Sequence, residues 1–178
     1  MRSNFLFIAV ASIAAAVPAA AQDIPKLTLV PGQAVTVPID EGDRAGAIER
    51  YAAQWTPFDL VAARHLAGQR PPEAPEPVAS PITGPEDAEP PPIPGGQVRL
   101  RFHSIAGRNT LLVVENGLGR AIAYRAQITS NGETKPTDVC LVMPGLPSYE
   151  HWPYPIQRIE LTGFRYVPWR PGQAPTCE

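Results

Sequence analysis

A proline-rich stretch near the middle of the chain most constrains what the chain can fold into. Residues 71–96, PPEAPEPVASPITGPEDAEPPPIPGG, contain ten prolines and five acidic residues but no basic residue. Because proline fixes φ and lacks a backbone N–H, we expect neither a helix nor a central strand here. The stretch is predicted to be an extended, solvated linker, in part polyproline II. An acidic strap that docks on a partner, or on the chain itself, is the alternative interpretation.

The first 21 residues have the layout of a secretory signal peptide. Arg2 precedes an apolar run from Phe5 to Val17, and Pro18 and small residues follow, up to Ala21. The run is too short for a membrane-spanning helix, which needs roughly 20 apolar residues. We therefore expect cleavage after Ala21, a product with no stable membrane span, and a periplasmic or secreted location. The alanine-rich signal and the preference for arginine over lysine favour a bacterial periplasm.

The formal net charge of the whole chain is only −2, which gives no reason to expect nucleic acid or an anionic membrane as partner. The charge is unevenly divided, however. Residues 22–94 carry 5 basic and 11 acidic side chains, whereas residues 95–178 carry 9 and 6. The two halves of the mature chain are therefore complementary in charge.

The two cysteines, Cys140 and Cys177, both lie in the part predicted to be exported. An isolated pair in an oxidising compartment is most simply interpreted as one structural disulfide. Redox-active pairs usually sit two residues apart at the start of a helix, so their spacing does not favour a catalytic role.

Before the linker, the pattern changes from strands to helix. Residues 27–30 and the alternation from Val35 to Ile39 predict short strands joined at a Pro31-Gly32 turn. Apolar residues at helical spacing predict one or two short helices within residues 43–68. Thr56 is the expected cap of a helix start, followed by Pro57 and by Asp59 near the positive end.

After the linker, short strands separated by turns are expected. Val98, Leu100 and Phe102 alternate with Arg99, Arg101 and His103, which predicts one apolar and one basic face. A dense apolar run leads to Asn116-Gly117, a predicted hairpin turn, and Asn131-Gly132 is a second one. Further strands are expected near residues 122–128, 137–142 and 156–166, with Gly163 a candidate bulge.

This pattern predicts a mainly β protein, an antiparallel β-sandwich with one or two short N-terminal helices. The stretch LLVVENGLGRAIAYRAQI, residues 111–128, resembles the paired core strands of immunoglobulin-like domains. The resemblance implies an immunoglobulin-like sandwich and informs the fold alone. The expected organisation is a strand and helix element at residues 22–70, the linker at 71–96 and the sandwich core at 97–178.

No sequence motif identifies an enzyme. The Gly-x-Ser-x-Gly motif of serine hydrolases, the histidine spacing of zinc sites and the glycine-rich phosphate loops are all missing from the sequence. Ser148, Glu150 and His151 are close in sequence, but catalytic triads are assembled by folding. We therefore predict no catalytic residue, no metal ligand and no cofactor. A small periplasmic hydrolase remains the alternative.

Binding is the chemistry that the residues favour. Tyr149, Trp152 and Tyr154 are expected in a proline-stiffened loop, where rigid rings suit recognition, or alternatively cap the core. Arg99 and Arg101 are expected to form a basic stripe that binds an anionic ligand or docks the acidic N-terminal half. Three more arginines were candidates for this stripe: Arg125, Arg158 and Arg165.

The predicted function is an exported, non-enzymatic binding or interaction module of the bacterial cell envelope. Its expected partner is an envelope protein or glycan. A structural accessory subunit of a larger envelope complex is a further alternative.

Overall fold

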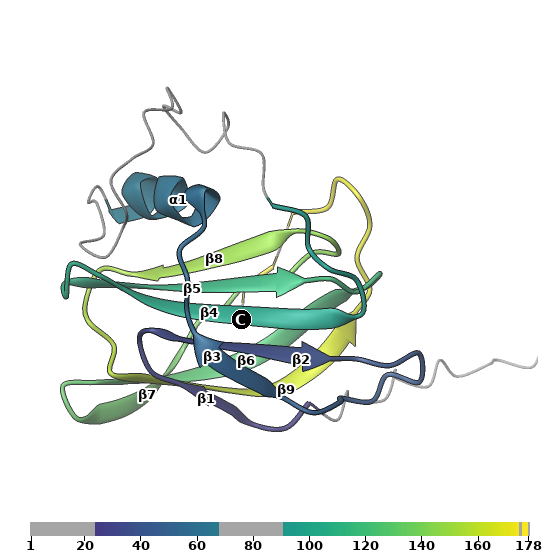
Figure 1. Cartoon of the computed structure of the whole chain (residues 1–178), viewed down its shortest axis with the longest axis horizontal. Helices are drawn as coiled ribbons and strands as arrows, with labels where there is room; N and C mark the ends of the chain where they lie inside the picture. Colours follow the sequence, from purple (N-terminus) through teal and green to yellow (C-terminus); the bar gives the residue numbers. More distant parts are fainter. Residues whose placement is uncertain (1–23, 68–90, 175, 178) are drawn as a thin grey trace, which may run out of the picture.

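The computed structural model describes residues 24–67, 91–174 and 176–177. The predicted signal peptide at residues 1–21 and most of the predicted linker, residues 71–90, lie outside them. The described chain is mainly β, with two antiparallel sheets and one short helix (Figure 1). In chain order the elements are β1 (Leu27–Leu29), β2 (Gln33–Pro38), β3 (Glu49–Ala52), α1 (Pro57–Ala67), β4 (Gln97–Ile105), β5 (Asn109–Asn116), β6 (Ala121–Ser130), β7 (Glu133–Thr137), β8 (Pro147–Trp152) and β9 (Arg158–Val167).

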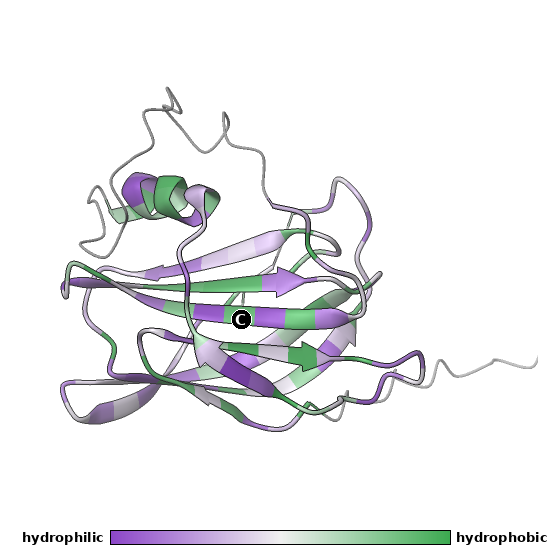
Figure 2. Cartoon of the chain, viewed as in Figure 1, coloured by the Kyte–Doolittle hydropathy of each residue, from purple (hydrophilic) through white to green (hydrophobic). Residues whose placement is uncertain are grey.

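The two sheets face each other around a shared apolar core, in a sandwich-like arrangement. One has four strands in the order β1-β9-β6-β7, and the other has five in the order β3-β2-β4-β5-β8. Apolar side chains from both sheets fill the space between them, among them Leu100 and Phe102 from β4 and Leu161 and Phe164 from β9. Hydrophobic and hydrophilic residues alternate along β4, so the apolar side chains on one face of this strand pack into the core (Figure 2).

Strands from before and after the predicted linker share both sheets. β1 pairs with β9, with Leu27 opposite Leu161, and β2 pairs with β4, with Val35 opposite Leu100. The Pro31-Gly32 turn between β1 and β2 forms as predicted, with φ of 89° at Gly32. The turn carries the chain from one sheet to the other.

The predicted Asn116-Gly117 hairpin is wrong. β5 and β6 belong to different sheets, so the chain crosses between layers at this point. The Asn116 side chain donates to the carbonyl oxygens of Arg120 and Val142 and accepts from the N–H of Leu118. A Cβ at Gly117 would lie 2.0 Å from the carbonyl oxygen of Pro94. The glycine is therefore needed for a close backbone approach and not for a hairpin turn.

The second predicted turn and the predicted bulge are both confirmed. Asn131 and Gly132 have positive φ, 51° and 81°, and form the two-residue loop of the β6–β7 hairpin. Gly163 on β9 has φ of 61° and lies where the pairing between β6 and β9 shifts register.

One helix forms within residues 43–67, where one or two were expected. Its start is the predicted one: the N–H of Asp59 donates to Thr56 Oγ1 at 3.0 Å, and the N–H of Thr56 donates to Asp59 Oδ2 at 3.1 Å. Upstream, β3 forms in place of a helix. Asp40 Oδ1 accepts the N–H groups of Gly42 and Arg44 in a turn that brings β3 back beside β2.

The stretch that holds the three predicted recognition rings is mostly a strand and not a loop. β8 lies at the edge of the five-stranded sheet and pairs with β5. Its side chains must therefore alternate between the two faces of that sheet.

The strand expected near residues 137–142 does not form over that range. The strand β7 ends at Thr137, and beyond it Cys140 and Val142 form only isolated bridges.

Cys140 and Cys177 form the predicted disulfide. The bond fixes the C-terminal segment to the body of the fold, together with a hydrogen bond from the N–H of Leu141 to the carbonyl oxygen of Thr176. Within the described residues, no helix has the length and apolar character that crossing a membrane requires.

Replacing both cysteines by serine is expected to lower the free energy of unfolding by roughly 3–4 kcal/mol, because the bond closes a long loop in the unfolded chain. Urea denaturation of the parent and of the Cys140→Ser/Cys177→Ser variant measures this. Reducing agent should destabilise the parent to the same level and leave the variant unchanged. Equal stability of parent and variant would show that the bond contributes no net stabilisation.

Candidate functional site

The outer face of the five-stranded sheet carries a concentration of charged groups near α1. On β4 the predicted alternation is confirmed: Val98, Leu100 and Phe102 lie in the core between the sheets. Arg99, Arg101 and His103 therefore lie on the opposite face, on which α1 packs against β5 and β8 (Figure 1).

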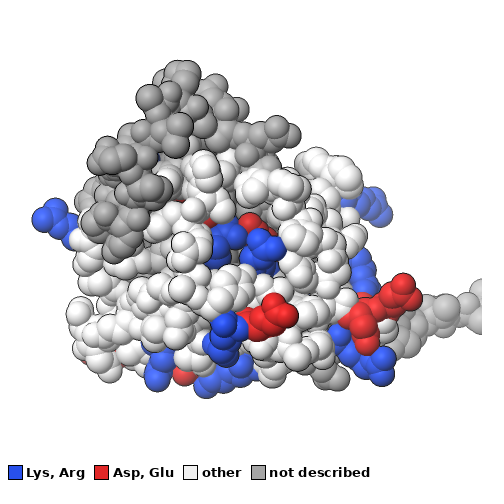
Figure 3. Space-filling model, in the orientation of Figure 1, with Lys and Arg blue, Asp and Glu red and all other residues white. Residues whose placement is uncertain are grey.

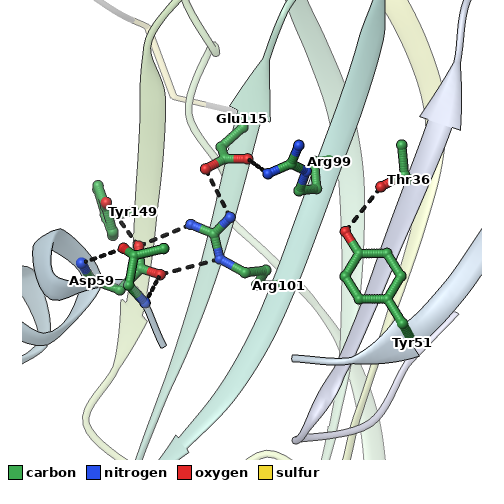
Figure 4. Close-up of polar contacts among 8 residues, drawn as sticks. Thr36, Tyr51, Asp59, Arg99, Arg101, Glu115 and Tyr149 are labelled. Carbon is green, nitrogen blue, oxygen red and sulfur yellow. Dashed lines mark hydrogen bonds and ion pairs between the residues drawn. The ribbon is translucent and has the colours of Figure 1, made fainter. Parts of the chain in front are cut away.

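Arg101 joins the helix to the sheet through Asp59. Its Nε donates to Asp59 Oδ2 at 3.1 Å and its Nη2 donates to Asp59 Oδ1 at 3.0 Å, so the guanidinium grips the carboxylate with two parallel hydrogen bonds (Figure 4). The side chains of Arg101 and Asp59 are 5% and 0% exposed. A charged pair this deeply buried is tolerated because each ion neutralises the other.

The Asp59 carboxylate also accepts hydrogen bonds from two other residues. It accepts the N–H of Thr56 in the helix cap, and Tyr149 Oη donates to its Oδ1 at 3.1 Å. Burial, together with the neighbouring Asp59, raises the pKa of Tyr149 well above its usual range, so the phenol keeps its proton. One carboxylate thereby holds α1, β4 and β8 together.

The chain of ion pairs continues along the sheet to Arg99. Arg101 Nη1 donates to Glu115 Oε1 at 2.7 Å, and Arg99 Nη1 lies 3.3 Å from Glu115 Oε2. Glu115 Oε2 accepts no hydrogen bond, so its contact with Arg99 is an ion pair only. For Arg101, burial lowers the pKa, but Asp59 and Glu115 outweigh it and raise the pKa above its usual value. The two arginines and two carboxylates cancel in formal charge.

Arg99 is the exposed member of this network. Its side chain is 28% exposed, whereas that of Glu115 is 3% exposed. In Figure 3, Lys and Arg atoms lie recessed near the middle of this face, with Asp and Glu atoms beside them. We call Arg99, with its partner Glu115 and the neighbouring Arg101, the Arg99 site. Tyr51 Oη and Thr36 Oγ1, 2.9 Å apart, lie on the side of Arg99 away from Asp59 (Figure 4).

The three predicted recognition rings do not share a site. Tyr149 faces α1, where its ring lies 5.9 Å from that of Phe58. Trp152 is 6% exposed, lies in the core between the sheets and donates from Nε1 to Thr137 Oγ1. Tyr154 is half-buried, with the Lys135 ammonium 5.6 Å above its ring. Of the residues proposed for binding, the structure thus brings together Arg99, Arg101 and Tyr149.

The wider arginine stripe does not form. Arg125 lies on β6, and Arg158 and Arg165 lie on β9, so all three belong to the other sheet. The acidic N-terminal half does reach Arg101, but through the single carboxylate of Asp59.

The serine, glutamate and histidine of β8 are separated by strand alternation. Glu150 pairs with Leu112, which faces the core, whereas His151 pairs with Leu111 on the outer face. Glu150 Oε1 accepts the N–H of Cys140 at 2.7 Å, and burial raises the pKa of this carboxyl. His151 therefore lies on the face away from Ser148 and Glu150.

Sequence analysis missed Glu115 as a partner of the arginines and the stacking of Trp55 on His103, whose ring centroids are 3.9 Å apart. One signal pointed to the Glu115 contact: a polar face on a strand that is apolar on its other side needs partners.

Comparison of the chain with protein-family models, with curated proteins and with solved structures gave no match.

Replacing Arg101 by methionine is expected to lower the free energy of unfolding by about 3–5 kcal/mol, because it leaves the buried Asp59 carboxylate without its counterion and Glu115 with Arg99 alone. Arg158→Met is the matched control, since Arg158 is half exposed and its ion pair with Glu160 is worth about 0–1 kcal/mol. Urea denaturation at neutral pH measures both. Similar small losses in the two variants would contradict the anchoring role of Arg101.

Stability should fall as the pH drops below about 6.5. Burial lowers the pKa of His103 to about 4; the smaller effect of Asp59 raises this pKa and that of Arg101 lowers it. In the unfolded chain the pKa of His103 stays near 6.5. Between these values the unfolded state binds the extra proton, so acid favours unfolding, by up to about 3 kcal/mol once the pH reaches 4.

Denaturation of the parent and of His103→Gln at several pH values tests this. The variant should lose less stability between pH 6.5 and 5, where few carboxylates titrate. Parallel curves for the two proteins would show that His103 does not stay neutral in the fold.

Proposed function

We propose that this chain is an exported, non-enzymatic binding module of the bacterial cell envelope. We further propose that it takes an envelope protein or glycan through an anionic group at Arg99. The observation that carries the proposal is the state of Arg99. Within the described residues it makes one ion pair and no hydrogen bond, and it is the exposed end of a network whose carboxylates are buried.

The electrostatics of the Arg99 site favour an anion. The acids that balance the arginines are 0% and 3% exposed, so an incoming ligand meets the guanidinium and not the carboxylates. Arginine N–H groups match the geometry of a carboxylate or a phosphate oxygen pair. Because the network is fixed by the buried pair beneath it, little side-chain entropy is lost on binding.

The arrangement supports binding and not catalysis. Arg101, Asp59 and Tyr149 use their polar atoms on one another, which leaves none of them free to move a proton. The hydrolase alternative needs Ser148, Glu150 and His151 in one cleft, and strand alternation does not favour that.

We retain the immunoglobulin-like relationship and the periplasmic or secreted location as parts of the proposal. Two antiparallel sheets around one core support the first, and the disulfide supports the second.

The experiment uses two defined probes, immobilised poly-glutamate for a protein partner and immobilised polygalacturonate for a glycan partner. We expect the parent chain to bind one of them and neutral dextran not at all, with binding weakening as salt rises. Arg99→Gln should weaken binding about tenfold or more, and Arg99→Lys should retain part of it. Arg158→Gln, on the other sheet, is the control and should bind as the parent does.

Failure to bind either probe, or equal binding by the parent and by Arg99→Gln, would contradict the proposed role of Arg99. A preference for one probe would identify the partner as protein or glycan.

A further inference from the structure

A hollow opens on the outer side of the five-stranded sheet, near the end of β4. Its volume is about 410 Å³, within the usual range for small-molecule sites. It is lined by Pro31, Gly32, Ala53, Gln54, Trp55, His103 and Ser104. We call it the Trp55 hollow.

The aromatic wall of this hollow is held in place. Trp55 stacks on His103, with ring centroids 3.9 Å apart and planes 23° apart, and packs against the small apolar cluster under α1. The backbone on either side is also fixed. The N–H of Ala53 donates to the carbonyl oxygen of Gly32 at 2.8 Å, and Thr56 caps α1. The indole is therefore positioned before any ligand arrives.

Two polar groups at this hollow have no protein partner. Within the described part of the chain, the exposed amide of Gln54 makes no side-chain hydrogen bond with another residue. Ser104 also lines the hollow, but strand alternation places its side chain on the face of β4 away from His103. His103 is 3% exposed, and its Nε2 is buried with no hydrogen-bond partner. Buried polar atoms are usually satisfied, so an orphaned ring nitrogen in the wall of a hollow needs an explanation.

Among the described residues, no charged side chain lines this hollow. Arg101 and Asp59, the nearest ions along β4 and α1, are bonded to each other, and the low pKa of His103 keeps its ring neutral at neutral pH. A ligand that fits is therefore uncharged, carries hydroxyl groups that donate and accept, and has an apolar face that packs against an indole.

We propose that the Trp55 hollow binds an uncharged sugar ring. The ring packs against the Trp55 indole, and its hydroxyls exchange hydrogen bonds with the Gln54 amide. This inference does not depend on the proposed role of Arg99, because Arg99 does not line the Trp55 hollow.

The test is direct binding of neutral sugars to the full chain, by saturation-transfer NMR and by calorimetry. The probes are glucose, galactose, N-acetylglucosamine, maltose and cellobiose, with glucuronate as the charged counterpart of glucose. We expect at least one neutral sugar to bind at millimolar concentration or better, and glucuronate to bind no more tightly than glucose. Arg99→Gln should leave this binding unchanged, which separates this inference from the Arg99 proposal.

Two substitutions locate the binding. Trp55→Ala should weaken it about tenfold or more, and Gln54→Ala should weaken it several-fold. Trp169→Ala is the control, because Trp169 lines a different depression, beside Tyr166. If Trp55→Ala does not fold, the Gln54 variant decides.

Three results would each overturn the inference. They are no binding of any neutral probe by the parent chain, binding unaffected by Gln54→Ala, and an equal loss in Trp169→Ala.

Discussion

The buried pair between Asp59 and Arg101 is the interaction on which the outer face of the five-stranded sheet depends. It connects the cap of α1 to the middle of β4 and, through Tyr149, to the edge strand β8. Because Asp59 neutralises Arg101 on one side, Glu115 pairs with both Arg101 and Arg99. Within the described residues, the N–H groups of Arg99 make no hydrogen bond and are available to a ligand. The segment that carries Trp55 is held between this anchored helix and β3.

Much of the fold was predictable because local sequence and final contacts agree. The alternation along β4, the Thr56 cap, the Asn131-Gly132 hairpin and the Cys140–Cys177 bond all follow from short-range chemistry or simple pairing. Where tertiary contacts compete with local patterns, prediction failed. Tyr51 lies at helical spacing but belongs to β3, since an Asp40 turn presents that segment to the free edge of β2. Asn116-Gly117 has the sequence of a hairpin turn, but the chain crosses from one sheet to the other there.

The candidate site was predictable only in part. Strand periodicity placed Arg99 and Arg101 on one face, but it does not tell which acid reaches them; Asp59 is 42 residues from Arg101 along the chain. The aromatic stretch that ends at Trp152 was misjudged because its prolines suggested a loop. Pairing with β5 made it a strand, and alternation then sent Trp152 inward and Tyr149 outward.

The pairing of β1 with β9 has a consequence for how the chain folds. Leu27, near the start of the described residues, pairs in register with Leu161 on β9, and β9 also pairs with β6. Only the β6–β7 hairpin of the four-stranded sheet pairs locally, so the sheet cannot be completed before β9 is available. Contacts this distant in sequence make folding slow relative to helical proteins of similar size. Until β9 is present, the edges of β1 and β6 that it pairs with stay open, and the chain in that state presents unpaired strand edges to any neighbour.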